Sequence, residues 1–103
     1  MKPVFILSTY PNKKSILKIA NELVKNKIIA CVNISKIDSV YSWNEKIQNS
    51  SEYIAIFKTV TKNKTKLKKI LGETHPYDVP EIAEIDVSSI NKSYLNWLIE
   101  STN

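Results

Sequence analysis

Few residues of this chain are of the types that carry chemistry, and they stand far apart. His75 is the only histidine and Cys31 the only cysteine, so neither a HExxH helix nor zinc-finger spacing can be built. A metal site within one chain would therefore be incomplete. No nucleophile with a neighbouring base is visible, and we do not expect an enzyme. The single glycine, Gly72, excludes the glycine-rich nucleotide-binding loops and the GxSxG elbow.

Each of these residues also has a structural interpretation. Cys31 lies in an alternating apolar stretch, where cysteine is more often a small buried side chain than a ligand. His75 stands at the end of a predicted helix before Pro76, so helix capping, ligand binding and contact with a cavity all stay open. Two prolines stiffen the segment from 75 to 81, which is either a structural crossover or the rim of a binding site.

Composition narrows the class of protein further. The 103 residues form one predicted domain over residues 1–103, and 43% hydrophobic residues suffice for a core. All fifteen basic residues are lysines, so the net charge of +5 comes without the arginine fork that reads bases and phosphates. We therefore expect no nucleic-acid partner. The apolar run at 4–7 is too short to span a membrane, and we expect a cytoplasmic protein.

The hydrophobic period changes in a definite order along the chain. Apolar runs and alternation predict strands at 3–10, 28–43, 52–60 and 81–87, and helical periodicity predicts helices at 12–26, 62–73 and 91–99. The order βαββαβ indicates an α+β, ferredoxin-like fold with a long hairpin between strands two and three and a short C-terminal helix. Alternation places Ile28, Ala30, Val32 and Ile34 on one face, and Ile29, Cys31 and Asn33 on the other.

The predicted sheet has more apolar surface than its own helices can cover. Both main helices lie on one face in this topology, yet strands one and three are apolar on both faces. An exposed patch of that size favours a homo-oligomer with closed symmetry. The hairpin carries Val40, Tyr41, Trp43 and Ile47 on a ribbon too long to fold back on its own core. We expect Tyr41 and Trp43 at the interface.

Several motifs, in the right order over nearly the whole chain, resemble the CutA divalent-cation tolerance family. They are Ala30 to Ile34, Ser39 to Trp43 with Lys46-Ile47 and Glu52, Lys58-Thr59, His75 to Ile82, and Tyr94 to Leu98. The resemblance implies a ferredoxin-like subunit in a tight homotrimer, similar in architecture to the PII signalling proteins. It also implies tolerance of copper and heavy metals.

Two positions depart from the metal-binding pattern of that family. Where family members with proposed copper ligation have a cysteine and a second histidine, this chain has Ser8 and Thr74. The donors that remain near this position are the imidazole of His75 and carboxylates such as those of Asp78 and Glu81, which groups from a neighbouring subunit can join. This borderline set suits copper(II) or another divalent cation at modest affinity. In the hairpin, Glu45 stands where the family has a glycine. We therefore expect Asn44 to adopt the left-handed turn conformation, with the turn shifted by one position.

Two functions of different class remain open from the sequence. The first is a trimeric protein that responds to metal ions, with clefts between subunits formed by Lys58, His75, Tyr77, Glu81 and residues near Cys31. The second is a rigid, PII-like signalling or scaffold module that acts through a protein or small-molecule partner. The fold also invites comparison with the RNA-recognition motif, but the glycines and arginines of that motif are missing.

Overall fold

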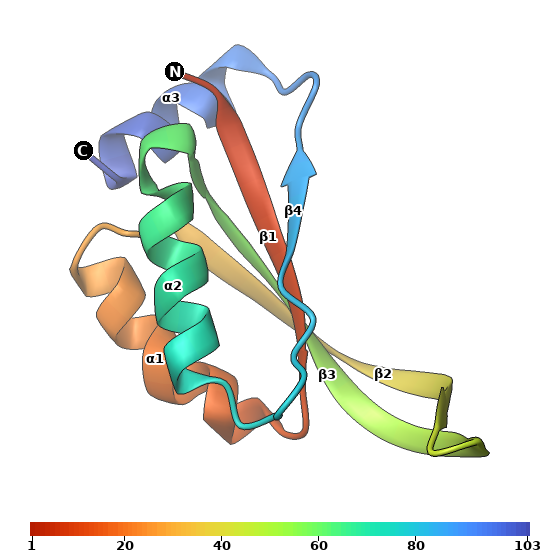
Figure 1. Cartoon of the computed structure of the whole chain (residues 1–103). Helices are drawn as coiled ribbons and strands as arrows, with labels where there is room; N and C mark the ends of the chain where they lie inside the picture. The colour runs from red at the N-terminus through yellow and green to blue at the C-terminus, as the bar shows by residue number, and fades with distance from the viewer.

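A computed structural model describes all 103 residues, Met1–Asn103. Its elements are β1 (Pro3–Tyr10), α1 (Lys13–Lys25), β2 (Cys31–Trp43), β3 (Lys46–Val60), a 3-10 turn η1 (Thr61–Asn63), α2 (Lys64–Thr74), β4 (Ala83–Asp86) and α3 (Lys92–Ser101). The four strands form one antiparallel sheet in the order β2-β3-β1-β4 (Figure 1). This is the ferredoxin-like topology that the element order predicts. No helix is both long and apolar enough to cross a membrane.

Local signals at both ends determine the bounds of α1. The side chain of Asn12 accepts a hydrogen bond from the backbone N–H of Ser15 at 2.8 Å, as an N-cap residue does. At the other end Lys27 adopts a left-handed conformation with φ of 61°, and the N–H of Ile28 donates to the Leu23 carbonyl. This Schellman-type end turns the chain from the helix back toward β2.

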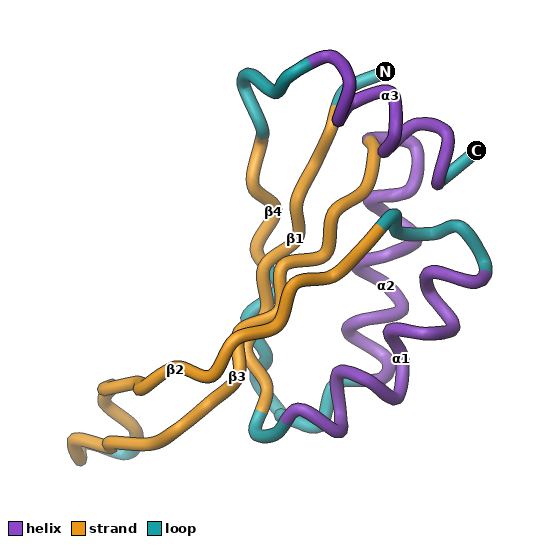
Figure 2. Tube along the Cα trace, turned by 180° about the vertical axis from the view of Figure 1, so that it is seen from behind, coloured by secondary structure: helices purple, strands orange, loops and turns teal.

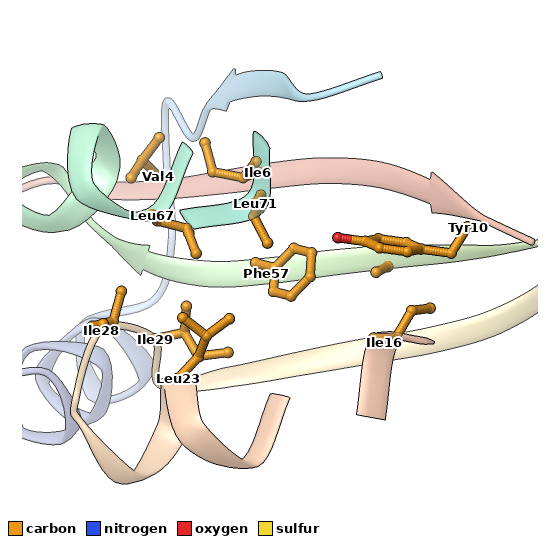
Figure 3. Packing of buried hydrophobic residues seen from close by; sticks show 11 residues of the cluster. Val4, Ile6, Tyr10, Ile16, Leu23, Ile28, Ile29, Phe57, Leu67 and Leu71 are labelled. Carbon is orange, nitrogen blue, oxygen red and sulfur yellow. The ribbon is translucent and has the colours of Figure 1, made fainter. Parts of the chain in front are cut away.

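Helices α1 and α2 cover one face of the sheet and enclose the main core. Figure 2 shows both helices on the same side of the four strands. Alternate side chains of β1 and β3 point into this layer and meet the apolar stripes of the two helices. The buried members that Figure 3 labels are Val4, Ile6, Tyr10, Ile16, Leu23, Ile28, Ile29, Phe57, Leu67 and Leu71.

The opposite face of the sheet is covered at one end only. Helix α3 packs Leu98 against Ala30 and Val60, with Phe5 and Tyr94 at the margin. The middle of this face, which we call the open face, carries Leu7, Ile54 and Ile56, and all three side chains are half-buried. The sequence predicts apolar surface there that the chain's own helices do not cover, and the structure agrees.

The faces predicted for Ile29 and Ala30 were wrong. Ile29 is fully buried in the core below α1 and α2, whereas Ala30 lies beneath α3. The prediction assumed that strand alternation starts at residue 28, but β2 begins at Cys31. Residues 28–30 belong to the chain reversal that follows α1, where a period of two does not apply.

The hairpin between β2 and β3 is closed by a two-residue turn. Asn44 and Glu45 have φ values of 51° and 63°, as in a type I′ turn, and Trp43 pairs with Lys46. The left-handed conformation expected of Asn44 is confirmed. The predicted start of the third strand at residue 52 was wrong, because cross-strand pairing continues through the polar segment to Lys46. The paired ribbon projects well beyond the helices (Figure 2).

The last strand is shorter than the sequence predicts. β4 spans only Ala83–Asp86 and pairs with β1 at the sheet edge, whereas the apolar pattern predicts a strand over 81–87. Glu84 leans toward the helix layer, where Lys64 and Lys68 of α2 bind its carboxylate at 3.2 and 2.8 Å. The segment from 75 to 82 is therefore a connection that wraps around the end of β1.

Candidate functional site

The side chain of His75 ties this connection to β1. His75 follows the last residue of α2 and is extended, as the residue before a proline must be. Its Nδ1 accepts a hydrogen bond from the backbone N–H of Tyr77 at 3.1 Å, and its Nε2 lies 3.1 Å from the Ser8 hydroxyl. The Ser8 hydroxyl in turn donates to the Glu81 carbonyl. This chain of contacts requires the neutral imidazole tautomer with its proton on Nε2.

Aromatic packing and burial hold the imidazole in that neutral form. The ring of His75 stacks on Tyr10 with centroids 4.1 Å apart and planes 21° from parallel. Burial lowers the pKa of His75 below its usual value of 6.5. The only nitrogen lone pair of a neutral imidazole is on Nδ1, and here it already accepts the Tyr77 N–H. As it stands, His75 is a structural tie between α2, β1 and the 75–82 connection.

The residues expected to ligate a metal do not converge within one chain. His75, Asp78 and Glu81 form no cluster of three side chains able to hold an ion. Thr74 donates its hydroxyl to the Ile70 carbonyl, and Ser8 is committed to the His75 network. Because the imidazole lone pair is also occupied, the donors of a single chain do not fit a resident copper site.

Asp78 and Glu81 instead line a cavity between the 75–82 connection and the hairpin. The cavity has a volume of about 480 Å³ and opens on the same side of the sheet as the open face. Its remaining carboxylate is Glu52, and its aromatic walls are Tyr41, Trp43 and Tyr77. No lysine lines it, although the chain contains fifteen. We call this the acidic aromatic cavity.

A partly buried hydrogen bond joins the two sides of the acidic aromatic cavity. The Tyr77 hydroxyl donates a hydrogen bond to Glu52 Oε2 at 2.7 Å, which joins the 75–82 connection to β3. Burial, followed by the hydrogen bond to Glu52, raises the pKa of the Tyr77 hydroxyl well above its usual range. The rigid presentation of Tyr77, Asp78 and Glu81 that two prolines predict is therefore anchored to the hairpin.

The cleft expected between subunits from Cys31, Lys58 and Tyr77 stays a prediction, and within one chain Tyr77 lies far from the other two residues. Cys31 and Lys58 are cross-strand partners near α3, where the Cys31 Sγ lies 3.7 Å from the Tyr94 hydroxyl. The Lys58 ammonium lies 5.3 Å from the centre of the Phe5 ring and 5.6 Å from that of Tyr94. Tyr77 contacts Glu52, six residues along β3 from Lys58 and thus roughly 20 Å away.

No local sequence pattern marks Glu52 or Tyr10 as a residue of this site. Both become recognisable only through the strand register. Tyr10 pairs with Tyr53, which brings the end of β1 beside Glu52 and under the crossover. A register of this kind depends on contacts between residues more than forty positions apart, for which the local pattern carries no signal.

Comparisons with known proteins identify the family of this chain. The family described as CutA1 divalent ion tolerance protein matches residues 4–101. The chain is 40% identical to the divalent-cation tolerance protein CutA of Pyrococcus horikoshii over 99 residues, covering 96% of this chain and 97% of that protein. It is 37% identical to the Thermotoga maritima protein of the same name, covering 95% and 97% of the two chains.

Solved structures show the same fold. The crystal structure of the divalent ion tolerance protein CutA1 from Ehrlichia chaffeensis superposes with a TM-score of 0.93 at 35% identity, covering 100% of this chain and 98% of that one. CutA1 from Pyrococcus horikoshii superposes with a TM-score of 0.90 at 40% identity, covering 97% and 98% of the two chains.

Proposed function

The chain belongs to the CutA1 divalent ion tolerance family, and from that premise we propose that it acts as a homotrimer in the cellular response to divalent metal ions, binding copper(II) or a related cation weakly. The family match over residues 4–101 carries the divalent-cation part of the proposal. The number of three copies comes from the resemblance to the CutA family, while the surface of the chain supports assembly and cation binding as such.

The open face supports assembly into a closed oligomer. Leu7, Ile54 and Ile56 form its half-buried centre, between α3 and the acidic aromatic cavity. The hairpin adds a second apolar surface, because Val40 and Ile47 lie on the side of the ribbon facing away from that cavity and are 70% and 69% exposed. A projecting two-stranded ribbon is marginal in water by itself. Burying it against identical copies in a closed ring stabilises every copy at once.

The carboxylates of the cavity rim support cation binding. Asp78 and Glu81 are exposed and can offer oxygen ligands that copper(II), zinc and other divalent ions accept. Groups from a neighbouring subunit would complete the ligand set. Without a free imidazole or a nearby thiolate, the affinity should be modest, and copper(I) should be retained poorly.

Calorimetry of the assembled protein with copper(II) tests this proposal. The double variant Asp78→Asn/Glu81→Gln should lose most of the binding, whereas Glu22→Gln, which removes an exposed carboxylate on α1, should bind like wild type. Cys31→Ser should also leave binding unchanged, because Cys31 lies at the other end of the sheet. Equal binding in all variants would place the ion elsewhere and contradict the carboxylate assignment.

His75→Ala adds a separate comparison. Loss of copper in this variant, with the trimer intact, would mean that the imidazole leaves the Tyr77 N–H to bind metal. Native mass spectrometry with a panel of divalent ions then identifies which cation the trimer retains and in what stoichiometry.

A further inference from the structure

The charge of the acidic aromatic cavity is opposite to that of the rest of the molecule. The chain as a whole carries +5, yet the cavity collects three carboxylates and no lysine. Glu52, Asp78 and Glu81 come from two segments that meet only in the folded chain, at β3 and at the crossover. The three carboxylates favour a cation at this place, although the chain as a whole is positively charged and Lys46 pairs with Trp43 at the end of the hairpin.

Three aromatic side chains line the cavity, and a metal site has no need of them. Trp43 and Tyr41 stand side by side on the cavity face of β2, two residues apart, and Tyr77 closes the opposite wall. Trp43 remains 53% exposed, and it has no cation–π partner of its own, whereas the Lys58 ammonium is already placed over Phe5 and Tyr94. Aromatic faces next to carboxylates are the surroundings in which organic ammonium ions lose water at least cost.

The oxygen donors are arranged less well for a coordinated ion. Glu52 Oε2 already accepts the Tyr77 hydroxyl, and the side chains around the cavity form no three-ligand cluster. A divalent ion needs several oxygens converging at short distances, whereas an ammonium group needs only separate hydrogen bonds and a nearby π face. The volume of about 480 Å³ also lies in the range of sites for small organic ligands.

We propose that the acidic aromatic cavity binds a small aliphatic ammonium ion, such as a diamine, between the faces of Trp43 and Tyr41 and the carboxylates of Asp78 and Glu81. This inference deepens the proposed function, on which it rests in part, by naming a second class of cation at the same carboxylates. The alkyl chain packs on the indole and phenol rings, and each ammonium end pairs with a carboxylate at the rim.

The test uses Trp43 as its own reporter. The chain has two tryptophans, so Trp97→Phe leaves Trp43 as the only source of indole fluorescence. Titrating this assembled variant with 1,5-diaminopentane at low ionic strength should change the emission saturably, and calorimetry on wild type should give the same midpoint. 1,5-Pentanediol, which has the same chain length and no charge, should give no saturable change, nor should sodium chloride of equal ionic strength.

Matched variants separate the cavity from general electrostatics. Glu81→Gln should weaken diamine binding by about two- to fivefold, while Glu22→Gln removes the same charge from α1 and should leave it unchanged. Trp43→Leu, followed by calorimetry, should weaken it by about two- to fivefold, as expected for loss of one π face. Trp43→Leu should not change copper(II) binding, because indole is not a ligand. Sedimentation of each variant shows whether it still assembles. If Trp43→Leu no longer forms the trimer, Tyr41→Leu takes its place in the experiment.

The outcomes distinguish this inference from the function on which it rests. Failure of the assembled protein to bind the diamine would overturn it, while copper binding and the trimer could still be observed. Equal binding of the diol, or equal weakening by Glu22→Gln and Glu81→Gln, would also overturn it. A monomer that binds diamine would contradict the proposed trimer but support the cavity assignment.

Discussion

At the scale of single residues, His75 shows how neighbours decide what a side chain can do. By type, a lone histidine beside two carboxylates is a natural metal ligand, and the sequence supports that hypothesis. The structure gives its two nitrogens a backbone donor at Tyr77 and a hydroxyl at Ser8, and places its ring on Tyr10. Its contribution here is to fasten the crossover, so its effect should appear first in stability.

The contribution of His75 to stability should depend on pH. Because burial lowers the pKa of His75 in the folded state, the unfolded state binds the proton more readily below about pH 6.5. Thermal stability should therefore fall between about pH 7.5 and about pH 5.5. In His75→Phe, which retains a ring to stack on Tyr10 but cannot titrate, the fall should be smaller. The lowered pKa of Glu84, caused by Lys68 and Lys64, acts below 4.5 and does not enter this range. An identical pH dependence in the variant would contradict this role.

The hydroxyl of Tyr10 is a second residue-scale feature with a measurable consequence. The side chain is 1% exposed, its hydroxyl has no hydrogen-bond partner, and Figure 3 shows the oxygen pointing toward Phe57. Burial raises the pKa of Tyr10 to about 12, and the Ser8 hydroxyl, which approaches the Tyr10 hydroxyl without meeting hydrogen-bond geometry, lowers it by less. An unpaired buried hydroxyl costs free energy that its removal restores.

We therefore expect Tyr10→Phe to raise the free energy of unfolding by roughly 1 kcal/mol. Denaturant unfolding at neutral pH measures the change. Tyr53→Phe is the matched control, because Tyr53 is the cross-strand partner of Tyr10 but is only half-buried, and it should leave stability nearly unchanged. A clear loss of stability in Tyr10→Phe would mean that the hydroxyl has a partner in solution.

At the scale of elements, the hairpin makes the cavity possible. An unbroken register from Cys31–Lys58 to Trp43–Lys46 keeps Tyr41 and Trp43 on the face that Glu52 shares, and it turns Val40 and Ile47 to the other face. A slip by one residue would exchange these two sets. The tight turn at Asn44 and Glu45 maintains that register, although neither residue is glycine.

Glu45 occupies a left-handed conformation that favours glycine. Replacing it in Glu45→Gly removes the steric cost of its side chain at φ of 63°, and should raise stability by about 1 kcal/mol. Glu45→Ala removes the same carboxylate but keeps a Cβ, so it should bring no such gain. Thermal unfolding of the three proteins gives the comparison, and an equal gain in both variants would trace the effect to charge.

At the scale of the whole molecule, a single chain leaves part of its apolar surface uncovered. The core below α1 and α2 is closed, while the open face and the outer side of the hairpin remain uncovered. Tyr41 and Trp43, expected from the sequence at the interface, line the chain's own cavity in the structure. Their place in the assembly stays a prediction, and the structure adds Val40 and Ile47 as contact residues.

Sedimentation at micromolar concentration should give a species of about three times 11.8 kDa. Ile47→Asp should shift it toward smaller species, because a charge replaces a side chain that we expect to be buried between copies. Lys46→Asp, next to it on the ribbon but on the opposite face, should perturb assembly less. A monodisperse wild-type monomer would refute the trimer.

The sequence by itself determined the order of the elements, the single sheet with two apolar faces, and the left-handed turn at Asn44. These features depend on local periods and on residues close together along the chain. Only the tertiary structure decided what the functional side chains meet. His75 is bound by Ser8, sixty-seven residues away, and Tyr77 by Glu52, so the expected ligand became a structural tie and the carboxylates gathered at an aromatic wall. Such pairings arise from strand register and from the path of the crossover, which local hydrophobic patterns do not encode.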